Sequence, residues 1–132
     1  MRAWREGAKP NLQRPIALDV HAADWGVGQL DVILCINMVH ISPWSATLAM
    51  LDGAARHLRA GGTLYLYGAY KRDGAHTAPS NESFDAWLKA QDPAFGVRDL
   101  EAVVREADSR GLALDRVVEM PANNLSVLFT RR

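Results

Sequence analysis

The chain has 132 residues, of which 48% are hydrophobic and 23% are charged, an ordinary composition for a globular protein with one core. Its 15 basic and 15 acidic side chains cancel, so bulk charge does not favour a nucleic-acid or membrane surface as a partner. No apolar stretch reaches the length that spans a bilayer, and the N-terminal residues lack the apolar core of a signal peptide. We therefore expect a single domain over residues 1–132.

The single cysteine, Cys35, lies inside an apolar run, which is typical of an inert core thiol. One cysteine cannot form an internal disulfide, and this agrees with a reducing, cytoplasmic location. The four histidines show no ligand spacing with Cys35, so no metal site is expected.

Two strands are predicted in the first third of the chain. Residues 15–20 form the first candidate, after a polar segment that ends near residue 14. Residues 21–29 are expected to form a loop or a short helix, because they contain turn-forming glycines. The run from Val32 to Ile36 is continuously apolar, which predicts a parallel strand covered on both faces.

A helix is predicted directly after this strand. Ser42 supplies an N-cap hydroxyl, and Pro43 suits the first helical position. Apolar residues then recur every three or four positions and share one helix face: Trp44, Leu48, Leu51, Ala55 and Leu58. Gly61 is expected to follow the helix end, and residues 63–67 to form the next strand.

A loop over residues 69–80 leads to another predicted helix. Ser80 or Asn81 can cap this helix, and Pro93 lies beyond its end. Its apolar residues include Phe84, so a helix face is available for packing.

The chain is predicted to end in a helix and two strands. The helix extends over residues 99–110, and Gly111 closes it. The strands cover residues 112–120 and 125–130, and the four residues between them make the pair antiparallel.

Several local motifs accompany this order of elements. They are NMVHISPW at 37–44, HTAPSN at 76–81, WL at 87–88, VRDL at 97–100 and MPANN at 120–124. With these motifs the chain resembles class I S-adenosylmethionine-dependent methyltransferases, and most closely a small methyltransferase-like family of unknown function. The resemblance implies an α/β, Rossmann-like methyltransferase sheet that ends in an antiparallel hairpin. It also implies methyl transfer from S-adenosylmethionine (SAM) to an acceptor that no motif identifies.

The resemblance also implies that some elements of the methyltransferase fold are missing from this sequence. Such proteins open with a strand and a glycine-rich turn for the methionine part of the cofactor, followed by a strand that ends in an acidic residue. Neither motif is found in this sequence, so we expect a truncated sheet that lacks its first two strands. The strand from Val32 to Ile36 then has an unpaired edge, which favours a homo-oligomer built through that edge, a collapsed sheet or a helix folded over it. This chain alone is then expected to be inactive. The alternative function is a non-catalytic remnant or an oligomeric binding module that does not bind SAM.

Ligands of such sheets bind at the carboxyl ends of the strands, where strand order reverses. The resemblance implies cofactor contacts at Asp19 and Val20, and again at Asn37 and Met38. For Asp19, the alternative is a carboxylate that caps the segment after it. Trp25 also has two interpretations, stacking on the adenine or packing against the protein.

The candidate catalytic residue is His40, as a general base with a pKa near working pH. The alternative for His40 is a turn histidine bonded to a backbone carbonyl. The predicted acceptor-binding residues are His40, Trp44, Tyr70, Arg72, His76 and Asn123. Three of these follow the strand at 63–67 and can recognise an anionic or planar acceptor. Asparagine also tolerates left-handed turn geometry, which is the other interpretation of the residues at 123 and 124.

Overall fold

The computed structural model describes residues 10–132. In chain order its elements are β1 (Leu30–Ile36), α2 (Trp44–His57), β2 (Leu58–Gly68), β3 (Lys71–Arg72), β4 (Ala75–His76), α3 (Pro79–Gln91), α4 (Leu100–Asp108), β5 (Leu112–Met120), the 3-10 turn η1 (Pro121–Asn123) and β6 (Asn124–Arg131). None of these helices is long and apolar enough to cross a bilayer.

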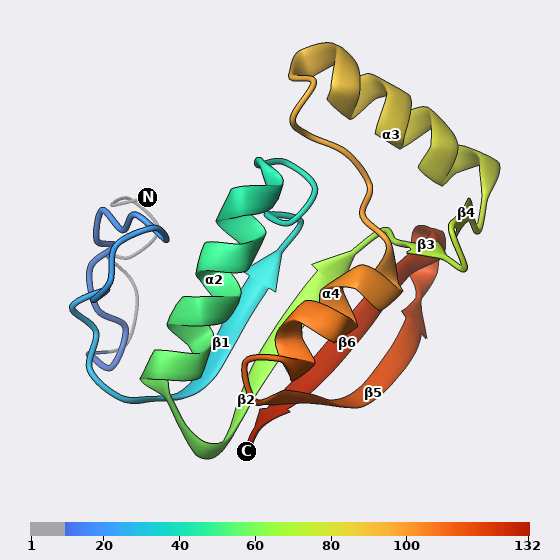
Figure 1. The fold of residues 1–132 in the computed structure, drawn as a ribbon. Coiled ribbons are helices and arrows are strands. Elements are labelled where there is room, and N and C mark those ends of the chain that lie inside the picture. Colours follow the sequence, from blue (N-terminus) through green and yellow to red (C-terminus); the bar gives the residue numbers. More distant parts are fainter. Residues whose placement is uncertain (1–9) are drawn as a thin grey trace.

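Four strands form one mixed sheet in the order β1-β2-β6-β5 (Figure 1). β1 and β2 are parallel, and α2 connects them, as in a Rossmann-like unit. β6 is antiparallel to both β2 and β5, so the chain ends in the predicted hairpin. The α/β class and the antiparallel C-terminal pair are confirmed.

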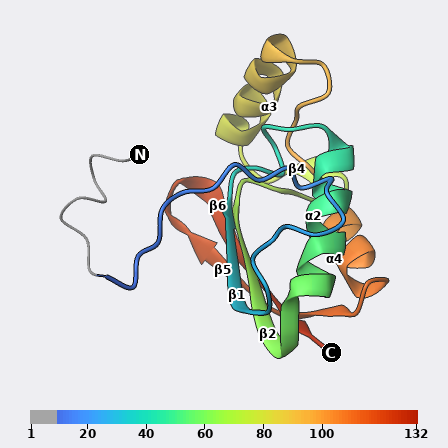
Figure 2. The same ribbon diagram turned by 90° about the vertical axis from the view of Figure 1, so that its left-hand side faces the viewer.

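Both α2 and α4 lie on one face of the sheet, whereas α3 lies beyond the carboxyl end of β1 (Figure 2). Most of the fully buried apolar side chains come from the two central strands and from these two helices: Leu51, Ala54, Leu64, Leu66, Val103, Ala107, Val127 and Phe129. Leu112 on β5 and Leu88 on α3 are also fully buried. The burial of these side chains from water is the main stabilising contribution to the fold.

The prediction that β1 is covered on both faces is wrong. Cys35 is buried on the helix side, but Val32, Leu34 and Ile36 point to the other face and are 53%, 66% and 63% exposed. The continuous apolar run could not reveal this, because both packing helices lie on the same side of the sheet.

The strand predicted over residues 15–20 is also absent from the described sheet, whose order begins with β1. A strand forms only where a neighbour completes its hydrogen-bond ladder, and the outer edge of β1 does not pair with this segment. Ile16 and Leu18 are 60% and 40% exposed. The segment ends in a turn in which the Ala22 N–H donates to the Asp19 carbonyl at 3.0 Å.

Helix α2 begins at Trp44 with Pro43 as its N-cap, one residue later than predicted. Ser42 does not cap it, because the Ser42 hydroxyl donates to the Met38 carbonyl at 2.5 Å. The buried face is made of smaller residues than the predicted apolar stripe: Ala46, Thr47, Met50, Leu51, Gly53, Ala54 and His57. The helix therefore turns a different side to the core than the apolar spacing predicts.

Other boundaries differ by a few residues. β2 begins at Leu58, directly after α2, and Gly61 has a φ of 81° at the irregular start of this strand. Helix α3 has Ala78 as its N-cap rather than Ser80 or Asn81. The predicted 69–80 loop contains the short β3–β4 hairpin.

Trp25 packs against α2, which supports the second interpretation of this residue. Its indole stacks on the His57 ring with centroids 4.8 Å apart, and its backbone N–H donates to His57 Nε2 at 3.2 Å. Gly53 makes this possible, because a Cβ at position 53 would lie 1.9 Å from the indole. A glycine inside the helix thus allows the preceding loop to lie flat on α2.

We expect Gly53→Ala to lower the free energy of unfolding by about 1–3 kcal/mol, because the new methyl group displaces Trp25. In a Trp25→Ala background, the same change should instead stabilise the protein by up to about 1 kcal/mol through helix propensity. Urea denaturation of the four proteins measures both effects. An effect of the same sign in both backgrounds would contradict this packing.

Candidate functional site

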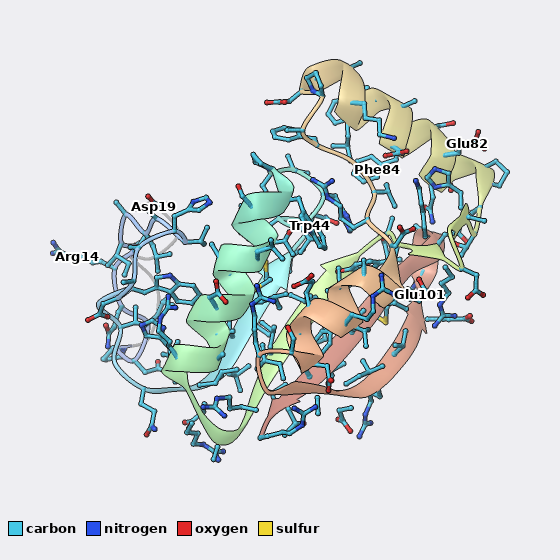
Figure 3. The ribbon with its side chains drawn as sticks, in the orientation of Figure 1. Arg14, Asp19, Trp44, Glu82, Phe84 and Glu101 are labelled. Carbon is cyan, nitrogen blue, oxygen red and sulfur yellow. The ribbon has the colours of Figure 1, made fainter. Side chains whose placement is uncertain are left out.

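An open pocket of about 230 Å³ lies at the carboxyl end of β1 and β2. We call it the amide pocket, and its lining residues are Asn37, Ala69, Ser80, Asn81, Phe84, Ala122 and Asn124. They come from the ends of β1 and β2, from the first half of α3 and from the β5–β6 connection. Figure 3 labels Phe84 on α3, beyond the carboxyl end of the sheet. Among residues 10–132, no titratable side chain lines this pocket, so the polar side chains of its lining are carboxamides and a hydroxyl.

The hydrogen bonds between the parallel strands β1 and β2 fix the position of Asn37. Its backbone N–H donates to the Tyr67 carbonyl at 2.8 Å, and its own carbonyl accepts from the His40 N–H at 3.2 Å. Its φ of 60° is left-handed, a conformation that asparagine tolerates better than most residues. Within residues 10–132, the Asn37 carboxamide makes no hydrogen bond, so its donor and acceptor are free for a ligand.

Asn81 fixes the start of α3 against the β5–β6 connection. Its side chain is 3% exposed and donates to Thr77 Oγ1 at 3.2 Å and to the Asn123 carbonyl at 3.3 Å. Asn123 has a φ of 60° and donates through its carboxamide to the Ser80 hydroxyl at 3.3 Å. Asn123 therefore has the left-handed turn geometry, and its side chain supports α3.

Asp85 anchors the middle of α3. Its carboxylate accepts from the Val97 N–H at 2.9 Å, from Lys89 Nζ at 2.9 Å and lies 3.3 Å from His76 Nε2. Burial alone would raise the pKa of Asp85, but the Lys89 ammonium and the Val97 N–H outweigh it and leave the pKa below its ordinary value. His76 is thus engaged under α3 rather than free on the rim.

His40 does not match the predicted general base. It is 0% exposed, its Nδ1 accepts from the Arg98 N–H at 3.4 Å, and its ring meets Tyr70 edge to face. Burial, and then the Arg98 guanidinium, lower the pKa of His40 from 6.5 to about 4. A histidine with so low a pKa is a weak base, and its buried ring is out of reach of an acceptor in solvent, so His40 is corrected to a structural residue. The sequence could not predict this pKa, because burial sets it.

Because Gly68 has no side chain, the His40 ring can occupy the space beside it. A Cβ at position 68 would lie 2.5 Å from His40 Nε2, which has no hydrogen-bond partner within the described chain. The backbone of His40 accepts from the Gly96 N–H at 3.0 Å. His40 therefore joins the loop after β1 to the segment between α3 and α4.

Neither Tyr70 nor Trp44 lines the amide pocket, and Trp44 instead lines a separate pocket of about 290 Å³ with Lys71 and Arg98. Tyr70 is 1% exposed, and burial raises its pKa, so it belongs to the core rather than to an accessible acceptor site. Trp44, at the start of α2 in Figure 3, lies under the Arg98 guanidinium at 5.6 Å. Arg98 also donates to the Val39 and Ser42 carbonyls at 3.2 and 2.8 Å.

Arg72 lines a second pocket of about 200 Å³ together with Asn123 and Glu119. This pocket adjoins the amide pocket, because Asn124 lines both.

The predicted cofactor residues fall into two groups. Asn37 and Met38 lie together after β1, whereas Asp19 lies on the other side of α2 from Phe84 in Figure 3. Asp19 Oδ1 accepts from the His21 N–H at 2.9 Å, which is the capping geometry named above as its alternative. The backbone carbonyl of Val20 accepts from Trp25 Nε1 at 3.2 Å.

Sequence reasoning missed Ser80, Asn81 and Phe84 as pocket residues. The sequence predicts helix caps at the first two positions and a packing residue at the third. Positions 80, 81 and 84 share a helix face by their spacing, which was the one available signal.

The fold is shared with several solved methyltransferases. An O-methyltransferase family protein from Burkholderia thailandensis has a TM-score of 0.70 and 15% identity, over 80% of this chain and 31% of that chain. CalO1, a methyltransferase in calicheamicin biosynthesis solved in an SAH-bound form, has a TM-score of 0.67 and 19% identity over 80% and 31%. PigF, solved with SAH, has a TM-score of 0.73 and 14% identity over 87% and 34%. The fold is therefore of the Rossmann-like methyltransferase type, and this chain spans about a third of the length of these structures.

A family model described as "Protein of unknown function (DUF938)" matches residues 1–131. The chain belongs to this family.

The buried, neutral His40 predicts how stability depends on pH. The unfolded histidine takes up a proton below about pH 6.5, whereas the folded one does so only near pH 4, so stability falls as the pH is lowered through this window. The loss is up to about 3 kcal/mol for a shift of this size. Urea denaturation at pH 7 and 4.5 should show a smaller loss for His40→Gln. Equal losses in both proteins would contradict the assignment.

Proposed function

We propose that this protein takes part in methyl transfer from SAM to a small-molecule acceptor, and that the amide pocket holds the acceptor. The observation that carries this proposal is the position of the pocket, at the carboxyl ends of the parallel strands β1 and β2. Open α/β sheets bind ligands at that edge. The fold supports the reaction class, since CalO1 and PigF share it and were solved with SAH.

The side chains of this chain can contact part of the SAM molecule. Within the described residues, the Asn37 carboxamide next to Met38 makes no hydrogen bond, and Asp19 Oδ2 has no partner while Oδ1 accepts from His21. The amide pocket, at about 230 Å³, is smaller than the roughly 300 Å³ at which pockets for drug-sized ligands begin. It therefore suits an acceptor group rather than a whole nucleoside cofactor. We assign the cofactor contacts to Asn37 and Met38, whereas Asp19 and Val20 keep the capping and Trp25 contacts described above.

SAM, when bound, supplies an electrophilic methyl group on its sulfonium. The contribution of this chain is to hold the acceptor in line with that group, and alignment of this kind can supply much of the rate enhancement. Asn37 would donate a hydrogen bond to the acceptor or accept one from it. Phe84 provides an apolar wall that excludes water from one side of the acceptor.

The described part of the chain provides no general base to the pocket, because none of its titratable side chains lines it and burial makes His40 a weak and inaccessible base. The acceptor must then be nucleophilic by itself or lose its proton to water. The pH dependence of the reaction is therefore expected to follow the pKa of the acceptor.

Asn37→Ala tests this role of the pocket. Loss of one orienting hydrogen bond should lower kcat/KM about tenfold, which corresponds to about 1.4 kcal/mol. The measurement is SAH released from SAM in the presence of a panel of small phenols and amines. Asn11→Ala is a matched control, because Asn11 is exposed and far in sequence from every lining residue. Equal activity of Asn37→Ala and the control would exclude the role proposed for the pocket.

One observation favours the second candidate, an oligomeric binding module without catalysis. The face of β1 opposite the helices is apolar and exposed, which is typical of an association surface. Absence of SAH release with every acceptor would favour this candidate.

A further inference from the structure

The separate pocket of about 290 Å³ at Trp44 shares no lining residue with the amide pocket. We call it the basic pocket. It lies between the start of α2, the short strand β3, the end of α3 and the start of α4 (Figure 1). Its aromatic and charged lining residues are Trp44, Lys71, Lys89, Arg98 and Asp99. None of its described lining residues belongs to the segment that precedes β1.

The charges around the basic pocket have a positive balance. Three cationic side chains line it, namely Lys71, Lys89 and Arg98. Two carboxylates lie beside them, because Asp99 also lines the pocket and Asp85 accepts from Lys89 Nζ at 2.9 Å. The three positive charges exceed these two negative charges. A hollow with this balance attracts an anionic ligand.

The Lys71 ammonium is available to such a ligand. The backbone of Lys71 is fixed, because its N–H donates to the Arg98 carbonyl at 3.0 Å and Lys71 forms a parallel bridge with Asp99. Within residues 10–132, the ammonium itself makes no hydrogen bond or ion pair, although the residue is half-buried. Its three N–H donors are therefore not used by the described part of the protein.

Arg98 is held in place by the protein and still keeps donors for a ligand. Its Nε donates to the Val39 carbonyl at 3.2 Å, and its Nη2 donates to the Ser42 and Ala94 carbonyls at 2.8 and 2.7 Å. Its Cζ lies 5.6 Å from the centre of the Trp44 ring. Nη1 has no hydrogen-bond partner among the described residues. Because the guanidinium is already fixed, little side-chain entropy is lost when it binds an anion.

The first turn of α4 adds to the positive potential. Asp99 is the N-cap of this helix, but its side chain makes no capping hydrogen bond. Ala102, in the first turn, lines the basic pocket. The N-terminus of a helix carries a partial positive charge, so an anion in the pocket meets this charge in addition to Lys71 and Arg98.

We propose that the basic pocket binds the phosphate group of a small organic molecule, with Lys71 Nζ and Arg98 Nη1 as donors. A phosphate monoester carries up to two negative charges and three strong acceptor oxygens, which suits two cations beside a helix N-terminus. A carboxylate offers one charge and two oxygens. Trp44 and Ala102 give the pocket apolar surface against which the organic part packs. This site is independent of the proposed function, because the two pockets have no lining residue in common.

Titration of the ¹⁵N-labelled protein with phenyl phosphate tests this site, because shifted resonances locate the bound ligand. Shifts are expected at the backbone amides of Lys71, Asp99 and Ala102 and at the indole N–H of Trp44. The Kd should be about 1 mM or lower. Benzoate, a carboxylate with the same ring, should bind about tenfold more weakly. Absence of shifts up to about 20 mM phenyl phosphate, shifts confined to the amide pocket, or equal affinity for benzoate would overturn the proposal.

A pair of glutamine variants separates this site from a general effect of charge. Lys71→Gln should weaken phenyl phosphate binding about tenfold and leave Tm unchanged, because the Lys71 side chain makes no bond in the described chain. Lys71→Arg should keep most of the affinity. Arg116→Gln removes the same charge on β5, where the side chain is 65% exposed, and should bind like the wild type. Undiminished affinity in Lys71→Gln, or an equal loss in both glutamine variants, would refute the site. SAH release should be the same in both variants, so the proposed function is tested separately.

Discussion

The parallel pairing of β1 with β2 is the constraint on which the rest of this structure depends. It aligns the ends of both strands, so Asn37 and Ala69 reach the same edge of the sheet. It requires a crossover, which α2 supplies, and it leaves Gly68 beside His40. The polar edge at which a ligand can bind is therefore a direct result of one backbone register.

A second set of contacts holds α3 over that edge. Asn81 ties the first turn of α3 to the β5–β6 connection, and Asp85 ties its middle to the Val97 backbone. Arg98 and His40 then fasten the following segment to the loop after β1. Asn81, Asp85 and His40 are buried, and each has a hydrogen-bond partner in another segment of the chain, so they position α3. His40 and Asp85 therefore have structural roles, and the polar side chains described in the amide pocket are neutral.

The sequence predicted the secondary-structure elements better than it predicted the packing around them. Apolar runs and turn residues predicted β1, β2 and the C-terminal hairpin, because these signals are local. The prediction of a strand over residues 15–20 was wrong, because a strand needs a hydrogen-bonded neighbour and no local sequence signal shows whether one is present. His40 and Tyr70 do follow strands as predicted, but the surroundings of His40 depend on Arg98 and Gly68, and Tyr70 packs edge to face against His40. Asn37 was the prediction that depended least on such distant partners, and it does line the pocket.

The central claim is that the methyltransferase-type sheet of this chain binds SAM at the carboxyl ends of its parallel strands. Calorimetric titration with S-adenosylhomocysteine tests it most directly, since the product of the reaction binds without any acceptor. We predict saturable binding with a Kd in the micromolar range, about −8 kcal/mol. Absence of heat up to millimolar ligand would contradict the claim and leave this chain a methyltransferase in fold only.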